Sequence, residues 1–347
     1  MHPILILRWV DLGDDMEKGT VSNHILKRSI TRHVRKNDAA LTGIGAATSS
    51  EDISMGNITE VAYLRAVNNL YGRGGSEIRE LSLSFMLGTN VSEDTVRREM
   101  KCLTELAYSD NKNVIINGNT FVTGSLGEEE YTASIVIKSN VVEEYPESNL
   151  NLTIFPGDRL NLTVSSGDRL ILAGYPARYG TEMLIRSNRD MLKGRFKDAF
   201  LDEYLWKCEK VGSSIYERYS IKKYIDALSG CEIKCIKPVS FGGVYRAIWE
   251  MADEAGLGAE VDHEKLQMEQ ETVEVAEFFH INPYMMLGTG AFIIAADGMN
   301  SVKILEVLGD ASDIGVFTKE KGCTVVSSLY DVKREITSYK SDELFKI

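Results

Sequence analysis

Residues 238–262 constrain the fold of this 347-residue chain more than any other stretch. Apolar residues recur there at intervals of three and four, which is the pattern of a helix with one buried face. They are Val244, Ala247, Ile248, Met251, Ala252 and Ala255. Ser240 is placed to cap this helix, and Gly256 and Gly258 are placed to end it. Residues 259–261 begin an extended segment, so the stretch predicts a helix followed by a strand.

Gly242 and Gly243 open the predicted helix, and two interpretations of the pair stay open. The glycines allow another part of the chain to pack closely against the turn, because they lack a side chain. Alternatively, they let an anion approach the free N–H groups at the positive end of the helix. The face of the helix away from the core is expected to carry the charged residues Arg246, Glu250, Asp253 and Glu254.

The composition is that of a globular protein of two ordinary domains, with 44% hydrophobic and 26% charged residues. A net charge of −12 argues against nucleic acid and against an anionic membrane as partners. Five scattered cysteines fit a reducing compartment, so we expect a cytoplasmic protein. Cys231 and Cys235 lack the spacing of a zinc site and are interpreted as thiols of a buried strand. No apolar stretch is long enough to span a bilayer.

The rest of the chain alternates between strand patterns and helix patterns, which predicts an α/β (α+β) fold. Strands are expected at residues 4–10, 80–87, 114–116, 131–138, 170–174, 231–236, 291–296 and 313–317, the segment 114–116 being a buried one. Helices are expected at residues 22–34, 57–70, 93–107, 179–185, 195–210, 220–229, 266–279 and 301–308, with Ser92 capping the third. Residues 339–347 are expected to be polar and peripheral. Gly-Asp-Arg-Leu occurs at residues 157–160 and 167–170, which predicts two successive turn-and-strand units.

Residues 238–262, together with residues 281–298 (INPYMMLGTGAFIIAADG), resemble the C-terminal domain of the AIR synthase superfamily. The nearest branch is that of the hydrogenase maturation factor HypE and AIR synthase-related proteins. The resemblance implies a two-domain fold, with a domain of residues 1–165 that binds ATP and dimerises and a C-terminal α/β sandwich of residues 166–347. It further implies a homodimer whose N-terminal strands form a shared barrel, with ATP and Mg²⁺ in the cleft between the domains.

The same resemblance supplies the candidate site residues. Cofactor-binding positions are Gly43, Gly45, Asn69, Asn119, Thr120, Gly242 and Gly243. Residues 41–47 and 117–123 correspond to glycine-containing loops of the family. Relatives carry acidic residues where this chain has Ala46, Ala47, Asn69, Asn119 and Phe121, and the Asp-Pro-Thr turn before the glycine pair is replaced by residues 238–241. We expect each changed ligand to weaken metal binding about tenfold or more. No metal ligands and no catalytic residues are assigned.

Two functions remain open at this point. The first is a HypE-like, AIR synthase-related dimer with a degenerate Mg-ATP site that is non-catalytic or altered. The second is an active ATP-dependent maturation, kinase or synthase-type enzyme that uses non-standard ligands, namely Glu51, Asp52 and Asp110. HypE ends in a Pro-Arg-Ile-Cys tail whose thiol carries the reacting group, whereas this chain ends in Phe345-Lys346-Ile347 and lacks that thiol.

Overall fold

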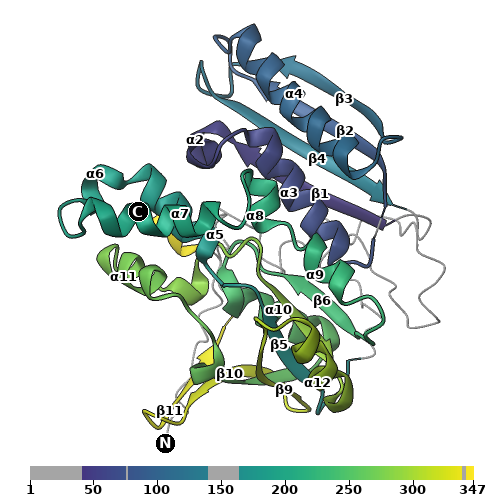
Figure 1. Ribbon diagram of the computed structural model, residues 1–347, viewed down its shortest axis with the longest axis vertical. Coiled ribbons are helices and arrows are strands. Elements are labelled where there is room, and N and C mark those ends of the chain that lie inside the picture. The colour runs from purple at the N-terminus through teal and green to yellow at the C-terminus, as the bar shows by residue number, and fades with distance from the viewer. Residues whose placement is uncertain (1–40, 76, 140–163, 338–340) are drawn as a thin grey trace, which may run out of the picture.

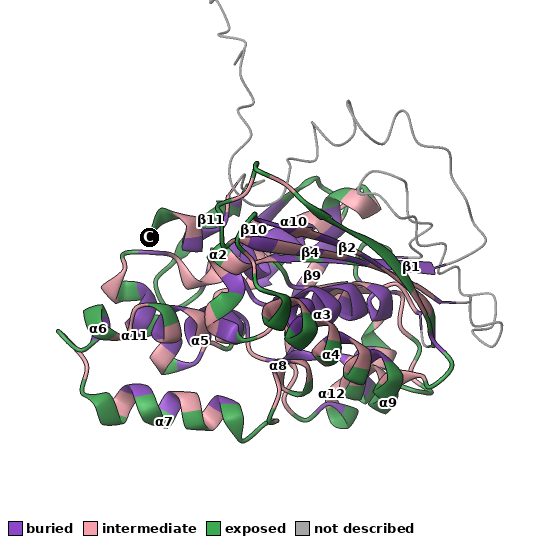
Figure 2. Ribbon diagram, turned by 90° about the horizontal axis from the view of Figure 1, so that it is seen from above, coloured by how far each residue is buried: buried purple, intermediate pink, exposed green. Residues whose placement is uncertain are grey.

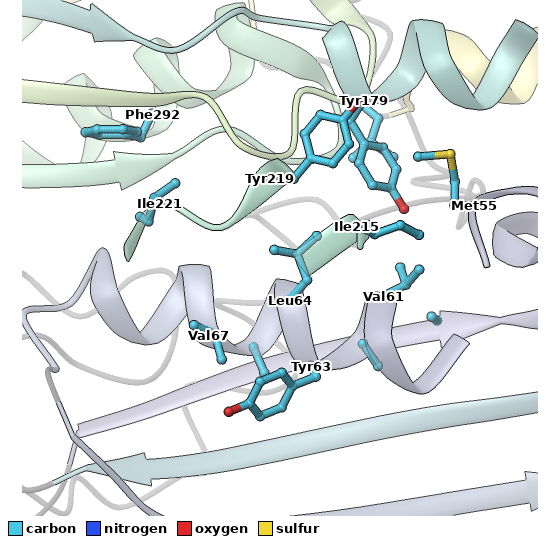
Figure 3. Close-up of a cluster of buried hydrophobic side chains, with 14 of the residues drawn as sticks. Met55, Val61, Tyr63, Leu64, Val67, Tyr179, Ile215, Tyr219, Ile221 and Phe292 are labelled. Atoms are coloured by element: carbon cyan, nitrogen blue, oxygen red, sulfur yellow. The ribbon is translucent and has the colours of Figure 1, made fainter. Parts of the chain in front are cut away.

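Helix α3 (Ile58–Tyr71) is the centre of the described part of the chain, and only Asn69 among its residues is not buried. The structure is a computed structural model that describes residues 41–75, 77–139, 164–337 and 341–347. One side of α3 lies against a four-stranded sheet, and its other side meets helices of the C-terminal part (Figures 1 and 2). In the close-up of Figure 3, Leu64 points toward Ile215 and Tyr219, whereas Val67 and Tyr63 point toward the sheet. A helix covered in this way joins the two halves through one hydrophobic core.

The N-terminal part, residues 41–139, is a four-stranded sheet with two long helices on one face (Figure 1). Its elements are β1 (Leu41–Thr48), α2 (Ser49–Asp52), η3 (Ile53–Met55), α3, β2 (Ile78–Leu87), α4 (Glu93–Asp110), β3 (Ile115–Val122) and β4 (Tyr131–Ser139). The strand order is β1-β4-β2-β3, antiparallel except for the parallel pair β2 and β3. Buried and partly exposed residues alternate along β4. The face of this sheet that is turned away from α3 is therefore left open by the described residues.

The C-terminal part is a seven-stranded mixed sheet of order β11-β10-β7-β9-β5-β8-β6, with helices on both faces. Its strands are β5 (Arg169–Ala173), β6 (Cys235–Pro238), β7 (Gly258–Asp262), β8 (Phe292–Ala296), β9 (Ser312–Thr318), β10 (Gly322–Ser327) and β11 (Val332–Ile336). Its helices are α5 (Arg178–Ser187), α6 (Arg189–Leu192), α7 (Asp198–Glu209), α8 (Ile215–Tyr219), α9 (Lys222–Ala227), α10 (Gly243–Ala255), α11 (Gln270–Phe278) and α12 (Gly298–Val307). The single-turn helices are η4 (His263–Lys265), η5 (Pro283–Met285) and η6 (Glu343–Lys346).

Strand β8 shows how this sheet separates two cores. Phe292 and Ile294 belong to the core shared with α3, and Ile293 and Ala295 belong to a second core under α10. Because successive side chains of a strand point to opposite faces, a strand covered on both faces is apolar throughout, as the sequence of residues 291–296 indicated.

The helix predicted within residues 238–262 is present as α10, followed by β7 as expected. Its start differs from the prediction, because Gly242 occupies the N-cap position with a φ of 82° and no side chain caps the helix. Ser240 contributes only its backbone carbonyl, to the N–H of Gly243. Gly256 closes the helix with a φ of 69°, a conformation that favours glycine. Arg246 is buried against Glu250, so this charged face is not simply solvated.

Three predictions for the N-terminal part were wrong. Residues 41–47 form strand β1 and not a loop, because they pair with β4 along their whole length. Residues 117–122 continue β3 and are not a loop, since they pair with β2. The segment 114–116 was expected to be buried, but Ile115 is 65% exposed. Strand β3 lies at the sheet edge, so it lacks a neighbour on its outer side among the described strands.

Other expectations have mixed outcomes. Ser92 caps α4 as predicted, by accepting a hydrogen bond from the N–H of Thr95. Cys235 is buried in β6, while Cys231 precedes the strand and is only partly buried. The strand at residues 4–10, the helix at 22–34 and the first Gly-Asp-Arg-Leu copy lie outside the described residues. The second copy leads into β5 through Gly167, whose φ is 96°.

The end of the chain was predicted to be peripheral, and this prediction was wrong for residues 342–344, whereas Lys346 and Ile347 are exposed. Asp342, Glu343 and Leu344 are all buried. They are covered because the carboxylate of Asp342 bonds the backbone N–H of Gly242 at the start of α10. No helix within the described ranges has the length and hydrophobicity to cross a membrane.

Candidate functional site

Gly43 and Gly45 of β1 bring the strand directly against the backbone of α3. A Cβ atom at Gly43 would overlap the carbonyl oxygen of Ala66, and one at Gly45 would overlap that of Ala62. No other residue allows this approach, because every other side chain begins with a Cβ atom. Both glycines therefore have a packing role in this chain.

Two side chains of α3, and a third from the turn just after it, bond the outer edge of β1. The bonds run from Arg65 Nη1 to Ala46 O (2.7 Å), from Asn69 Nδ2 to Ile44 O (2.8 Å) and from Arg73 Nη1 to Thr42 O (2.9 Å). Four helix residues rise about 6 Å and two strand residues about 6.6 Å, so donors at every fourth position meet alternate carbonyls. Asn69 thus uses its amide group as a donor, which a carboxylate could not do.

Arg65 also binds one of the carboxylates considered as a replacement metal ligand. Its guanidinium makes two hydrogen bonds to Asp52, of 2.7 and 3.0 Å, and both side chains are buried. Burial, the largest single effect, lowers the pKa of Arg65, but the charge and hydrogen bonds of Asp52, together with smaller contributions from Tyr179 and Glu51, raise it overall. The Arg65 guanidinium lies 5.0 Å from the ring centroid of Phe241. Asp52 is therefore neutralised within the protein, and Arg65 reaches the turn before α10.

The turn of residues 238–243, called the glycine turn below, meets both α3 and the chain end. A Cβ atom at Gly72 would overlap the ring of Pro238, and one at Gly243 would overlap the carbonyl oxygen of Tyr284. Gly243 is therefore required by close packing, the first of the two interpretations. The N–H of Gly242 donates to Asp342 Oδ2 at 2.6 Å, so an anion of the chain itself occupies the position that the second interpretation expected.

Asn119 and Thr120 lie apart from the other candidate residues. In the sheet register, Asn119 pairs with Ser84, Ser84 with Ser134, and Ser134 with Ala46. Three strand spacings separate Asn119 from Ala46, which is about 14 Å. Thr120 is the next residue of β3 and points to the opposite face. The structure thus joins Gly43, Gly45 and Asn69 to the glycine turn through α3, but it does not bring Asn119 and Thr120 to that place in one chain.

Asp110, the other candidate carboxylate, accepts hydrogen bonds from two tyrosines. Tyr63 of α3 donates at 2.8 Å and Tyr216 of α8 donates at 2.5 Å. Burial, followed by the charge of Asp110, raises the pKa of both phenols. Through these two hydrogen bonds, Asp110 links α3, α4 and α8.

Among the described residues, no three His, Cys, Asp or Glu side chains are grouped so that they could hold a metal ion.

The predictions from sequence did not include Arg65, Phe241 and Asp342, which make the closest contacts at the glycine turn. The spacing of Arg65 and Asn69, four residues apart, was a visible signal for donors on one helix face, and Arg73 continues the spacing in the turn after the helix. Nothing local to Asp342 indicated its partner, since the two residues are 100 positions apart.

The chain has the fold of the AIR synthase superfamily, which confirms the resemblance predicted from the sequence. Residues 165–328 match the family model described as AIR synthase related protein, C-terminal domain. A comparison with curated proteins finds no match.

Three solved structures illustrate the likeness. HypE from E. coli, a hydrogenase maturation protein, has a TM-score of 0.66 and 18% identity, covering 90% of this chain and 92% of its own. A HypE structure in complex with ATP has a TM-score of 0.64 and 14% identity, with 94% and 97% covered. Thiamine monophosphate kinase from Aquifex aeolicus has a TM-score of 0.58 and 15% identity, with 88% and 96% covered.

Proposed function

We propose that this chain is a HypE-like, AIR synthase-related protein whose Mg-ATP site is degenerate and no longer catalytic. The site lies between a domain of residues 1–165 and a domain of residues 166–347. Two similar folds carry nucleotide ligands: one HypE structure is a complex with ATP, and one thiamine monophosphate kinase structure is a complex with AMPPCP and TMP. Nucleotide in the cleft is therefore the ligand class that this proposal takes over from the relatives.

The observation that carries the proposal is that polar side chains near the junction of α3 and the glycine turn bond to other groups of the protein. Asn69, at a position where relatives have a carboxylate, donates its amide to Ile44. The neighbouring carboxylate of Asp52 is already neutralised by Arg65. Magnesium needs hard oxygen ligands, preferably charged ones, to bring it to a triphosphate. With these groups engaged in internal bonds, the described residues at this junction offer little free negative charge for the metal ion that phosphoryl transfer requires.

The competing function is an ATP-dependent enzyme with Glu51, Asp52 and Asp110 as substitute ligands. Asp52 and Asp110 would first have to give up buried partners, Arg65 and the tyrosine pair. Losing a hydrogen bond to a charged group costs about 1.5–3 kcal/mol, so metal binding here would have to overcome that cost. This opposes the enzyme hypothesis.

The open face of the four-stranded sheet supports a homodimer within the same proposal. Ile44 is 42% exposed and pairs with Val136 on that face, and Phe121, 43% exposed, lies on the same face of β3 at the other edge of the sheet. Exposed apolar residues on a sheet face indicate a surface that another molecule covers.

All five cysteines are free thiols, which supports a reducing, cytoplasmic compartment.

Calorimetric titration with ATP, with and without Mg²⁺, tests the proposed site. We expect Mg²⁺ to change the affinity for ATP by less than about threefold, because the acidic ligands are missing. An increase of tenfold or more with Mg²⁺ would overturn the degenerate site and favour the enzyme. No binding at millimolar ATP would overturn the nucleotide part of the proposal.

Restoring a carboxylate provides a second measurement. Asn69→Asp is expected to make ATP binding depend on Mg²⁺ by about tenfold relative to the wild type. Asn113→Asp is the matched control, since Asn113 is an exposed residue between α4 and β3 and the change adds the same charge. If both variants behave alike, Asn69 does not occupy a ligand position.

A further inference from the structure

The last seven residues, Ser341–Ile347, form a short tail that packs against the glycine turn. Asp342 is 1% exposed and Glu343 is 4% exposed, although both are acidic. Isolated carboxylates are costly to bury, so such residues are covered only where they find donors. The tail therefore makes specific contacts.

Asp342 makes the central contact. Its Oδ2 accepts from the N–H of Gly242 at 2.6 Å, and its Oδ1 accepts from the N–H of Leu344 at 2.9 Å. A further backbone hydrogen bond comes from Leu287. Gly242 is the N-cap of α10, where the helix dipole favours a negative charge. A carboxylate of the tail thus satisfies the first backbone donor of the helix.

Two further side chains hold the tail in place. The ring of Phe345 stacks on that of Phe241 with centroids 5.6 Å apart and an interplanar angle of 20°. Glu343 accepts a hydrogen bond of 3.3 Å from the N–H of Asn282. Phe241 in turn contacts Arg65 of α3, so the tail, the glycine turn and the N-terminal part form one continuous contact.

We propose that the tail is a detachable latch, which closes the glycine turn with its own carboxylate when docked and frees the Gly242 N–H when it leaves. Leu344 is the one tail residue in the core shared with α3, and the other contacts are backbone hydrogen bonds and one stacked ring pair, so undocking uncovers a single core side chain and leaves the second core unchanged. This inference does not depend on nucleotide binding.

The latch is sensitive to pH. Burial raises the pKa of Asp342 to about 6, and the negative charge of Glu343 adds to the rise. The hydrogen bonds from three backbone N–H groups act in the opposite direction and lower the pKa. A freely exposed aspartate has a pKa of about 3.9. The charged groups on the elements packed here are Glu343 and Lys346 on the tail, Arg246 on α10 paired with Glu250, and Arg65 on α3 paired with Asp52.

The raised pKa of Asp342 determines in which direction pH changes the docking of the tail. Because docking raises the pKa, docking takes up a proton, and it is favoured below the pKa of the free side chain. The advantage disappears as the pH rises through about 6. Between pH 5.0 and pH 7.5 the docking constant is expected to fall by about tenfold.

Amide hydrogen exchange of the full chain measures the latch. We expect the protection factor of the Gly242 N–H, corrected for intrinsic exchange, to fall by about tenfold from pH 5.0 to pH 7.5. The N–H of Ile294 in the central strand β8 reports global stability and is expected to change less. Equal changes at both amides would overturn the latch, because the tail would then open only when the whole protein unfolds.

Substitutions separate docking from its pH dependence. Asp342→Asn keeps an accepting oxygen, so protection of Gly242 persists and its pH dependence disappears. Asp342→Ala and Phe345→Ala lower that protection at pH 5.0, and Ile347→Ala, at a residue 48% exposed, leaves it unchanged. Wild-type protection of Gly242 in Asp342→Ala would contradict the assigned contact. A pH dependence that persists in Asp342→Asn would assign the proton to another group.

Discussion

At the scale of single residues, the buried pair of Arg65 and Asp52 decides what the candidate site can do. Arg65 bonds Asp52 with two hydrogen bonds, bonds the carbonyl of Ala46 and contacts Phe241. The guanidinium of Arg65 thus donates its hydrogen bonds to other groups of the protein. A carboxylate held in this way stabilises the fold. Under the proposed function, Asp52 therefore does not bind a metal ion.

Replacing Asp52 by Asn tests this pair. The substitution leaves the Arg65 charge buried without its partner, so we expect a loss of about 3–5 kcal/mol in the free energy of unfolding. Urea denaturation measures it. Glu105→Gln removes one partner of an exposed pair on α4, with Lys101 at 3.8 Å, and should have no measurable effect. Equal stability of Asp52→Asn and wild type would show that Asp52 is not committed to Arg65.

At the scale of elements, the contact between β1 and α3 depends on two glycines that the resemblance assigned to nucleotide binding. The backbone of α3 lies so close to Gly43 and Gly45 that a methyl group has no room. Arg65 and Asn69 of α3, with Arg73 just after the helix, then donate hydrogen bonds to the strand edge. The glycines that the family resemblance assigned to a ligand loop thus define a strand–helix contact here.

The variant Gly45→Ala measures this contact. Its methyl group would overlap the carbonyl oxygen of Ala62, and we expect a loss of about 1–3 kcal/mol in stability as the helix is displaced. Gly124→Ala is the matched control, because a Cβ atom there has nothing within 4 Å. Thermal unfolding of both variants compares them directly. A neutral Gly45→Ala would mean that β1 and α3 are farther apart than described.

The tyrosine pair on Asp110 joins α8 to α3 and α4. Tyr216→Phe removes the 2.5 Å hydrogen bond to this carboxylate and leaves the bond from Tyr63. We expect the variant to lose about 1.5–3 kcal/mol in denaturant titration, as for hydrogen bonds to charged groups. Tyr108→Phe, on the exposed side of α4, removes a hydroxyl from a 46% exposed ring and should be neutral. Similar losses in both variants would argue against a special role of Asp110.

At the scale of the whole molecule, the open face of the four-stranded sheet is the surface through which we propose that the chain dimerises. The proposed homodimer covers this face, so a charge placed on it should separate the subunits. Ile44→Lys is expected to shift the protein from dimer to monomer in light scattering after size-exclusion chromatography. Val302→Lys on α12 places the same charge at a residue 56% exposed and should leave the mass unchanged. A dimer that survives Ile44→Lys would have to use another surface.

Several elements were predictable from sequence because their patterns are local. The apolar spacing along α10 and the continuous apolar run of β8 are patterns of residues that lie close together in the sequence, so they can be recognised without the structure. The cap at Ser92 depends on residues three positions apart. The resemblance to the AIR synthase superfamily rested on these elements and their order, which is why the fold could be predicted while the site could not.

Only the tertiary structure decided which polar groups are engaged. Asp52 and Arg65 are 13 positions apart, Tyr216 and Asp110 are 106 apart, and Asp342 and Gly242 are 100 apart. No periodicity encodes such pairs, because a buried charge takes whichever partner the packing brings within reach. The strand edge at β3 was likewise invisible, since burial of a strand depends on its neighbours in the sheet. By itself, then, the sequence determined the elements with local patterns and the fold family. Contacts between residues far apart in the sequence decided which polar groups of the candidate site and of the tail are engaged.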